Sequence, residues 1–121
     1  MVRYKKVIIL IDENTQSTAE LFASVLKKYN VGVLIGRRTK GWGTVERIFP
    51  IKQQIDPNET YSVFLVHSLT LREDGQPIEE NGVEPTISID DPDWKNQLFA
   101  YFHWQELAQV VEEIWENPPF K

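Results

Sequence analysis

The chain has 121 residues and a formal net charge of −5, with 41% hydrophobic and 26% charged residues. This composition predicts one globular domain and excludes a disordered chain. The acidic balance argues against a nucleic-acid partner, since phosphate binding requires clustered lysine and arginine. The absence of cysteine excludes disulfides and cysteine nucleophiles. The longest apolar run, at residues 7–11, is too short to insert across a membrane, and no signal-peptide pattern is present.

The first third of the chain predicts a β-α-β unit. The apolar run at residues 7–11 is typical of a strand covered on both faces, as in a parallel sheet. Residues 31–35 predict a second buried strand, reached by a right-handed crossover. The loop at residues 36–43 contains three glycines, which are expected to permit tight backbone turns. Residues 17–28 have helical spacing, with four apolar side chains on one face: Leu21, Phe22, Val25 and Leu26.

The rest of the chain predicts short strands followed by a helix. Strands are expected at residues 44–49, 61–66 and 69–71, and Pro50 is expected to end the first. Residues 94–116 form one helical pattern. The helix carries more aromatic surface than one buried stripe needs, so part of that surface is expected to meet a partner. The apolar positions of this helix are Leu98, Phe102, Leu107, Val110, Val111 and Ile114.

The turn at residues 14–17 delivers Ser17 to the start of a helix, and two interpretations of this serine stay open. Ser17 and Glu20 match the capping box S-x-x-E, in which the serine binds backbone N–H groups and does no chemistry. Alternatively, Ser17 is a nucleophile beside a helix N-terminus, whose N–H groups and dipole favour an oxyanion. A nucleophilic serine needs a base. His67 and His103 are expected to be structural or exposed, and a lysine is the other option.

A resemblance to a known family rests on the order of several motifs. The run LIDENTQSTAE at residues 10–20 resembles the serine motif of the C-terminal-processing, or tail-specific, serine peptidases. Residues 33–46 are similar to the next segment of that family. Parts of residues 69–85 are similar to a later segment of the same family. The resemblance covers residues 6–90. It implies an α/β fold in which a β-α-β unit of a Clp-protease/crotonase-like layered sheet is followed by short strands and a C-terminal helix.

The resemblance also implies a catalytic site with Ser17 as the nucleophile, a lysine base and a supporting glutamine. Trp42 occupies the lysine position and Glu46 the glutamine position, and an indole N–H cannot accept a proton. Lys40 lies two residues away, about 7 Å along an extended chain. It is an option as substitute base, and otherwise belongs to a solvated basic loop. Trp42 itself either packs in the loop or core, or lines a peptide groove.

No cofactor and no metal are expected. The acidic groups at residues 12–13, 79–80 and 90–93 lack metal-ligand spacing, and solvated faces and a helix N-terminus explain them. The loop at residues 36–43 does not match the phosphate-binding pattern G-x-x-x-x-G-K-[ST].

For domain organisation, the resemblance implies that residues 1–121 are a single domain and the C-terminal part of a larger peptidase catalytic domain. Residues 6–90 would be the family-like core and residues 91–117 the C-terminal helix. The family's glycine-rich oxyanion segment and peptide-binding PDZ region would precede residue 1.

The expected function is a fragment of a tail-specific serine peptidase domain, inactive as it stands because Trp42 replaces the lysine. The alternative is a non-catalytic pseudo-peptidase that binds peptide or forms oligomers. Expected partners are peptide or protein C-termini as substrate, with a second copy of the chain or the missing upstream segment covering open strand edges. Members of this family usually act in the periplasm or cell envelope, and the sequence does not show the compartment.

Overall fold

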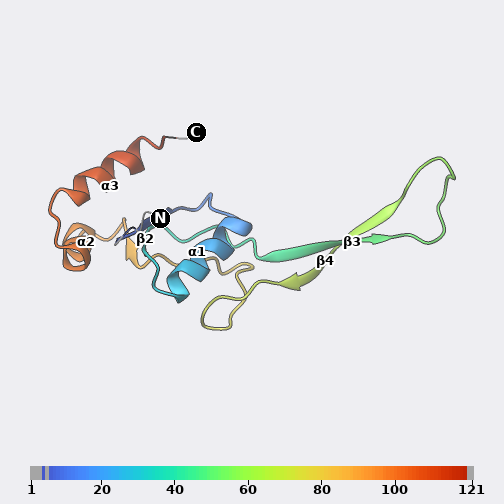
Figure 1. Ribbon diagram of the computed structural model, residues 1–121, viewed down its shortest axis with the longest axis horizontal. Coiled ribbons are helices and arrows are strands. Elements are labelled where there is room, and N and C mark those ends of the chain that lie inside the picture. The colour runs from blue at the N-terminus through green and yellow to red at the C-terminus, as the bar shows by residue number, and fades with distance from the viewer. Residues whose placement is uncertain (1–3, 5, 120–121) are drawn as a thin grey trace.

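The computed structural model describes residue 4 and residues 6–119, which form a layered α/β structure (Figure 1). Its central sheet has three parallel strands in the order β1-β2-β5. The strands span Ile8–Ile11 (β1), Val33–Gly36 (β2) and Ile87–Ser88 (β5). The predicted β-α-β unit is therefore confirmed, and the sheet is buried on both faces as such apolar strands require.

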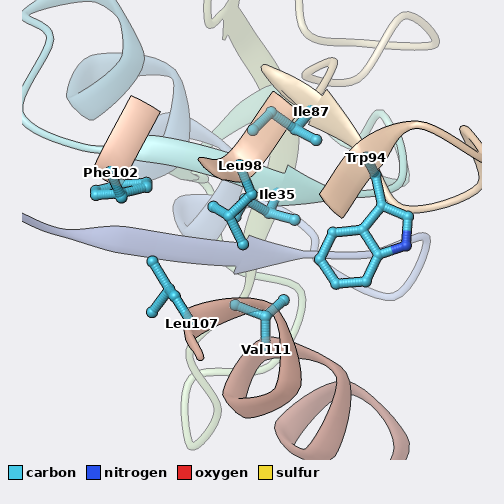
Figure 2. Packing of buried hydrophobic residues seen from close by; sticks show 7 residues of the cluster. All are labelled: Ile35, Ile87, Trp94, Leu98, Phe102, Leu107 and Val111. Carbon is cyan, nitrogen blue, oxygen red and sulfur yellow. The ribbon is translucent and has the colours of Figure 1, made fainter. Parts of the chain in front are cut away.

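The two faces of the sheet carry separate hydrophobic cores, because successive strand residues point to opposite faces. Leu34 belongs to the core on the side of helix α1, which spans Thr18–Lys28 and contributes Ala23. The next residue, Ile35, belongs to the core on the other face. Figure 2 shows this second cluster, in which β2 and β5 meet the two C-terminal helices: Ile35, Ile87, Trp94, Leu98, Phe102, Leu107 and Val111.

The C-terminal segment forms two helices, so the single helix predicted over residues 94–116 is wrong. Helix α2 spans Trp94–Phe102 and helix α3 spans Leu107–Glu116. His103 ends α2 by taking a left-handed conformation with φ of 51°, and its N–H donates to the Phe99 carbonyl. This break turns the chain, so the apolar residues of both helices reach the same face of the sheet.

Helix α1 ends where its spacing predicted and begins one residue later, with Ser17 as its N-cap, but its apolar face points outward. Ala23 and Ser24 are buried, whereas the exposed fraction of Phe22 is 62% and those of Leu21 and Val25 are each 41%. Small side chains on the buried side let the helix approach the sheet closely. The larger apolar side chains therefore form an uncovered face on the described part of the chain.

Strands β3 (Thr44–Pro50) and β4 (Ser62–Leu69) form an antiparallel hairpin with a bulge between Val45 and Glu46. The hairpin extends away from the body of the molecule (Figure 1). β3 ends at Pro50, as predicted. The strand expected at residues 61–66 lies largely within β4, every residue of which is exposed. The strand expected at residues 69–71 is wrong, because β4 ends at Leu69 and Leu71 forms only an isolated antiparallel bridge with Pro77.

The Glu20 carboxylate joins the first turn of α1 to the loop after β2. Its exposed fraction is 0%, and it accepts four hydrogen bonds. Oε2 accepts the backbone N–H groups of Ser17 at 2.9 Å and Trp42 at 2.7 Å. Oε1 accepts the Thr39 hydroxyl at 2.5 Å and the Gly41 N–H at 2.7 Å. The four acceptor sites of an ionised carboxylate are thus filled by four donors.

Buried Thr39 extends this contact to the chain that precedes β5. Its hydroxyl oxygen accepts the Val83 N–H at 2.7 Å, and its own N–H donates to the Val83 carbonyl at 3.1 Å. Gly41 has a φ of +85°, and a side chain there would meet the Glu80 backbone at 3.0 Å. This glycine therefore has the role predicted for it, because only glycine combines this conformation with so close an approach.

Glu20→Gln should destabilise the protein by about 2–4 kcal/mol, because the carboxamide turns one acceptor into a donor that faces buried N–H or O–H groups. Urea unfolding followed by circular dichroism measures this. Glu113→Gln, an exposed change of the same charge on α3, should shift the unfolding free energy by less than about 0.5 kcal/mol. Equal unfolding midpoints for Glu20→Gln and the unmodified chain would show that the carboxylate does not hold the loop.

Candidate functional site

A short turn after β1 presents Ser17. The Asp12 carboxylate accepts the N–H groups of Asn14 at 3.0 Å and Thr15 at 2.9 Å, together with the Thr15 hydroxyl at 3.0 Å. Burial raises the pKa of Asp12, but the hydrogen bonds from Asn14 and Thr15 outweigh it, so the pKa lies below its ordinary value. The ionised carboxylate therefore orders the turn that leads into the serine.

Ser17 has a φ of 57° and a ψ of −127°, a conformation that non-glycine residues rarely adopt. Such a backbone costs about 1–3 kcal/mol and persists where surrounding contacts impose it. The bond from the Ser17 N–H to Glu20 is such a contact, and it is also the glutamate half of the predicted capping box. A helix-cap position and a strained, exposed serine thus coexist at one residue.

A cavity of about 210 Å³ opens beside Ser17. It brings together Ser17, Trp42 and Glu46, three of the four residues that sequence analysis singled out for the site. Its lining combines hydroxyl groups with apolar side chains and one carboxylate: Ser17, Thr18, Leu21, Trp42, Gly43, Thr44, Val45, Glu46 and Thr70. Lys40, the fourth predicted residue, does not line it.

Trp42, Thr44 and Glu46 are linked by side-chain hydrogen bonds along the wall of this cavity. The Trp42 Nε1–H donates to the Thr44 hydroxyl oxygen at 3.1 Å, and the Thr44 hydroxyl donates to Glu46 Oε1 at 2.5 Å. The exposed fraction of Trp42 is 46%, so the indole lies at the surface rather than in the core. The backbone N–H of Trp42, in contrast, is fixed by Glu20 at 2.7 Å.

Lys40 has other partners. Its ammonium group donates to Gln16 Oε1 at 2.8 Å and lies 5.4 Å from the centre of the Trp42 ring. Its backbone N–H donates to the Thr15 carbonyl at 3.0 Å. These contacts attach the loop to the turn before Ser17, and they use the amine that a substitute base would need.

The two histidines lie elsewhere on the molecule. His67 is exposed on β4, with Nδ1 2.8 Å from the Ser68 hydroxyl, and His103 packs edge-on against Phe99 with ring centres 5.8 Å apart. Within residues 4 and 6–119, no group of three or more histidine and carboxylate side chains is placed to hold a metal ion. No helix in that same part of the chain has the length and apolar character needed to cross a membrane.

Three residues that shape the site were not singled out from the sequence. Thr39 completes the Glu20 contacts, Thr44 links Trp42 to Glu46, and the Glu79 carboxylate accepts the Gly43 N–H at 2.7 Å. Threonines in a loop and a glutamate in an acidic pair have no pattern that distinguishes them from surface residues. The sequence predicted only one part of this network, the S-x-x-E pair at residues 17–20, and it predicted that pair as a helix cap.

Comparisons with known proteins match most of the chain to one family. The family model described as peptidase family S41 matches residues 2–89. The carboxy-terminal processing protease CtpA of Bacillus subtilis is 30% identical over 90 residues, which cover 74% of this chain and 18% of that protein.

Two solved structures are similar to the chain as well. A photosystem II D1 C-terminal processing protease matches 70% of this chain and 20% of its own, with a TM-score of 0.60 and 24% identity. Mature CPAF in complex with lactacystin matches 93% of this chain and 21% of its own, with a TM-score of 0.57 and 27% identity. The chain therefore spans about a fifth of the length of these three proteins.

The expected Clp-protease/crotonase-like fold class is confirmed by these structural matches. The resemblance read from the serine motif is confirmed by the family model, which covers the serine turn, the loop with Trp42 and the hairpin. The chain belongs to peptidase family S41.

Proposed function

We propose that the chain is the part of a serine peptidase catalytic domain that carries the nucleophile, Ser17. The placement of this serine supports the proposal most directly. Ser17 lies between β1 and α1 in a strained turn and lines a cavity. The dipole at the N-terminus of α1 favours the oxyanion that forms when a serine attacks a carbonyl. Family membership supports hydrolysis of a peptide bond as the reaction.

In this reaction the Ser17 oxygen bonds to the carbonyl carbon, and the hydroxyl proton passes to a base. The base then returns the proton to the leaving amine, and water hydrolyses the acyl-enzyme. Trp42 cannot serve as this base, since the nitrogen lone pair of an indole belongs to the aromatic ring and the N–H is a donor only. Glu46 is the one ionisable side chain in the cavity lining, and a carboxylate is a much weaker base than a lysine amine. The chain as it stands is therefore proposed to be inactive.

Lys40 is the remaining candidate for a substitute base. Its amine would have to leave Gln16 and the Trp42 ring and enter a cavity that Lys40 does not line. A base must come within about 3 Å of the proton that it removes. The present contacts of Lys40 thus support a structural role in joining the loop to the serine turn.

The chain is proposed to be the C-terminal part of a larger catalytic domain, with residues 6–90 as its family-like core and residues 91–117 as its C-terminal helices. The similar proteins are about five times longer, which supports this. The whole protein would then act on protein C-termini, the substrates that the name of the Bacillus subtilis relative indicates for that protein. Segments outside this chain would supply further oxyanion contacts.

A second function, as a non-catalytic peptide-binding or oligomerisation module, is favoured by the exposed surface. The accessible surface of the chain is 9232 Å². A compact protein of 14.1 kDa exposes about 6,700 Å². The excess of about 2,500 Å² is roughly three times what one partner buries in a standard interface. It includes the apolar face of α1 and strand β4, so a second copy or another segment is proposed to cover them.

The unmodified chain should hydrolyse no peptide and should form no adduct with a fluorophosphonate, because no strong base reaches Ser17. Intact-mass spectrometry after incubation measures the adduct, with a known serine hydrolase as positive control. A mass increase located on Ser17, and absent in Ser17→Ala, would contradict the proposed inactivity.

Trp42→Lys should produce a Ser17 adduct where the unmodified chain has none, because it places an amine in the serine cavity. A general base contributes about 10²- to 10⁴-fold to such a step. The substitution leaves the backbone bond from residue 42 to Glu20 in place. Trp104→Lys, at another exposed tryptophan, is the matched control and should remain unlabelled. If both variants stay unlabelled, loss of the lysine does not explain the inactivity.

The chain should sediment as a dimer or larger assembly, because apolar surface of this extent favours association. Replacing Phe64 and Val66 of β4 by lysine should shift the assembly toward monomer in sedimentation velocity. Ser62→Lys with Ser68→Lys adds the same charge to the same strand at small polar positions and should leave the assembly intact. A stable monomer at high concentration would contradict the oligomerisation proposal.

A further inference from the structure

We propose that the cavity beside Ser17 is a specificity site for a basic side chain, lysine or arginine, of the bound peptide. This inference rests on the proposed function, because it takes Ser17 as the point where the peptide carbonyl lies. It adds a substrate class to that function and assigns the recognition to Glu46.

The size of the cavity matches one side chain. Its volume is about 210 Å³, below the roughly 300–1,000 Å³ of sites that enclose a whole small molecule. Leu21, Trp42 and Val45 supply apolar walls, and threonine hydroxyls supply the polar part of the lining. Such a site accepts a side chain that has a hydrocarbon stem and a polar end.

The charge of the cavity is negative and uncompensated. Glu46 is the one ionisable residue in the lining, and it takes part in none of the ion pairs found among the described residues. Thr44 donates to Oε1, while Oε2 receives no hydrogen bond within the same residues. One carboxylate oxygen is therefore free for an incoming cation.

The hydrogen-bonded chain from Trp42 through Thr44 fixes the direction of this carboxylate. A lysine or arginine stem can lie along the apolar walls while its charged end reaches Glu46, as these amphipathic side chains commonly do. The bond between a cationic donor and a carboxylate is stronger than a neutral one. A purely apolar side chain of the same length would instead cover Glu46 and leave its charge unpaired, which costs free energy.

The neighbouring cation does not occupy the cavity. Lys40 donates to Gln16 and approaches the Trp42 ring, and it is absent from the lining. The ammonium also discourages a second cation on that side of the indole, so the incoming charge is directed to Glu46. Acidic side chains are excluded by repulsion from the same carboxylate.

The test compares two ligands that differ only in the charged end, Nα-acetyl-lysine N-methylamide and Nα-acetyl-norleucine N-methylamide. Each is titrated into the ¹⁵N-labelled full chain, and the indole N–H signal of Trp42, one of four tryptophans, reports binding. That signal is assigned with Trp42→Phe. The lysine derivative should bind at least about fivefold more tightly, the size expected for a partly exposed charge pair.

Glu46→Gln keeps the size of the side chain and should bring the two dissociation constants within about twofold of each other. Glu59→Gln, the same charge change at an exposed position on the hairpin tip, should leave the lysine preference unchanged. Equal affinities in the unmodified chain would overturn the proposal. So would a lysine preference that survives Glu46→Gln.

The result for the basic site can be distinguished from the result for the proposed reaction. The lysine preference should persist in Ser17→Ala, since the hydroxyl takes no part in recognising charge. A preference without any Ser17 adduct in Trp42→Lys would support the basic site and contradict the explanation of the inactivity by loss of the lysine. An adduct without a lysine preference would do the reverse.

Discussion

The site depends on one buried carboxylate. The Glu20 carboxylate accepts hydrogen bonds from the backbone N–H groups of Ser17 and Trp42. It also accepts the Thr39 hydroxyl and the Gly41 N–H, which belong to the loop after β2. These bonds impose the strained conformation of Ser17 and hold the loop against the start of α1. Thr39 passes the constraint on to the chain before β5. A buried charge is tolerated there because every acceptor site has a donor.

This arrangement separates the fold of the site from its chemistry. Glu20 binds the backbone of residue 42, so the side chain at that position is not needed to hold the loop. The indole instead faces the cavity and donates to Thr44. A tryptophan can therefore stand where the family resemblance implies a lysine, while the serine turn and the loop keep their places. The cavity that remains is negative, through Glu46, and partly aromatic.

The two hydrophobic cores are small, and much apolar surface lies outside them. Leu34 belongs to the core on the α1 side of the sheet, and Ile35 belongs to the core on the α2–α3 side. The outer face of α1 and the whole of β4 have no cover within the described residues. A two-stranded hairpin without a packed face is marginal on its own in water. The extended hairpin is therefore the part of the described structure that would be stabilised most by packing against a partner.

The sequence by itself determined the β-α-β unit, helix α1, the strand ending at Pro50 and the family, because these depend on local periodicity, turn chemistry and ordered motifs. It also placed Ser17, Trp42 and Glu46 in one candidate site, and the structure lines one cavity with them. Only the tertiary structure decided which face of α1 is buried, since that follows from close packing of Ala23 and the bonds of Glu20. The division of the C-terminal segment into two helices follows likewise from packing both onto one sheet face. Local patterns carry no information on such long-range contacts, and Thr39 and Thr44 gained their roles only through them.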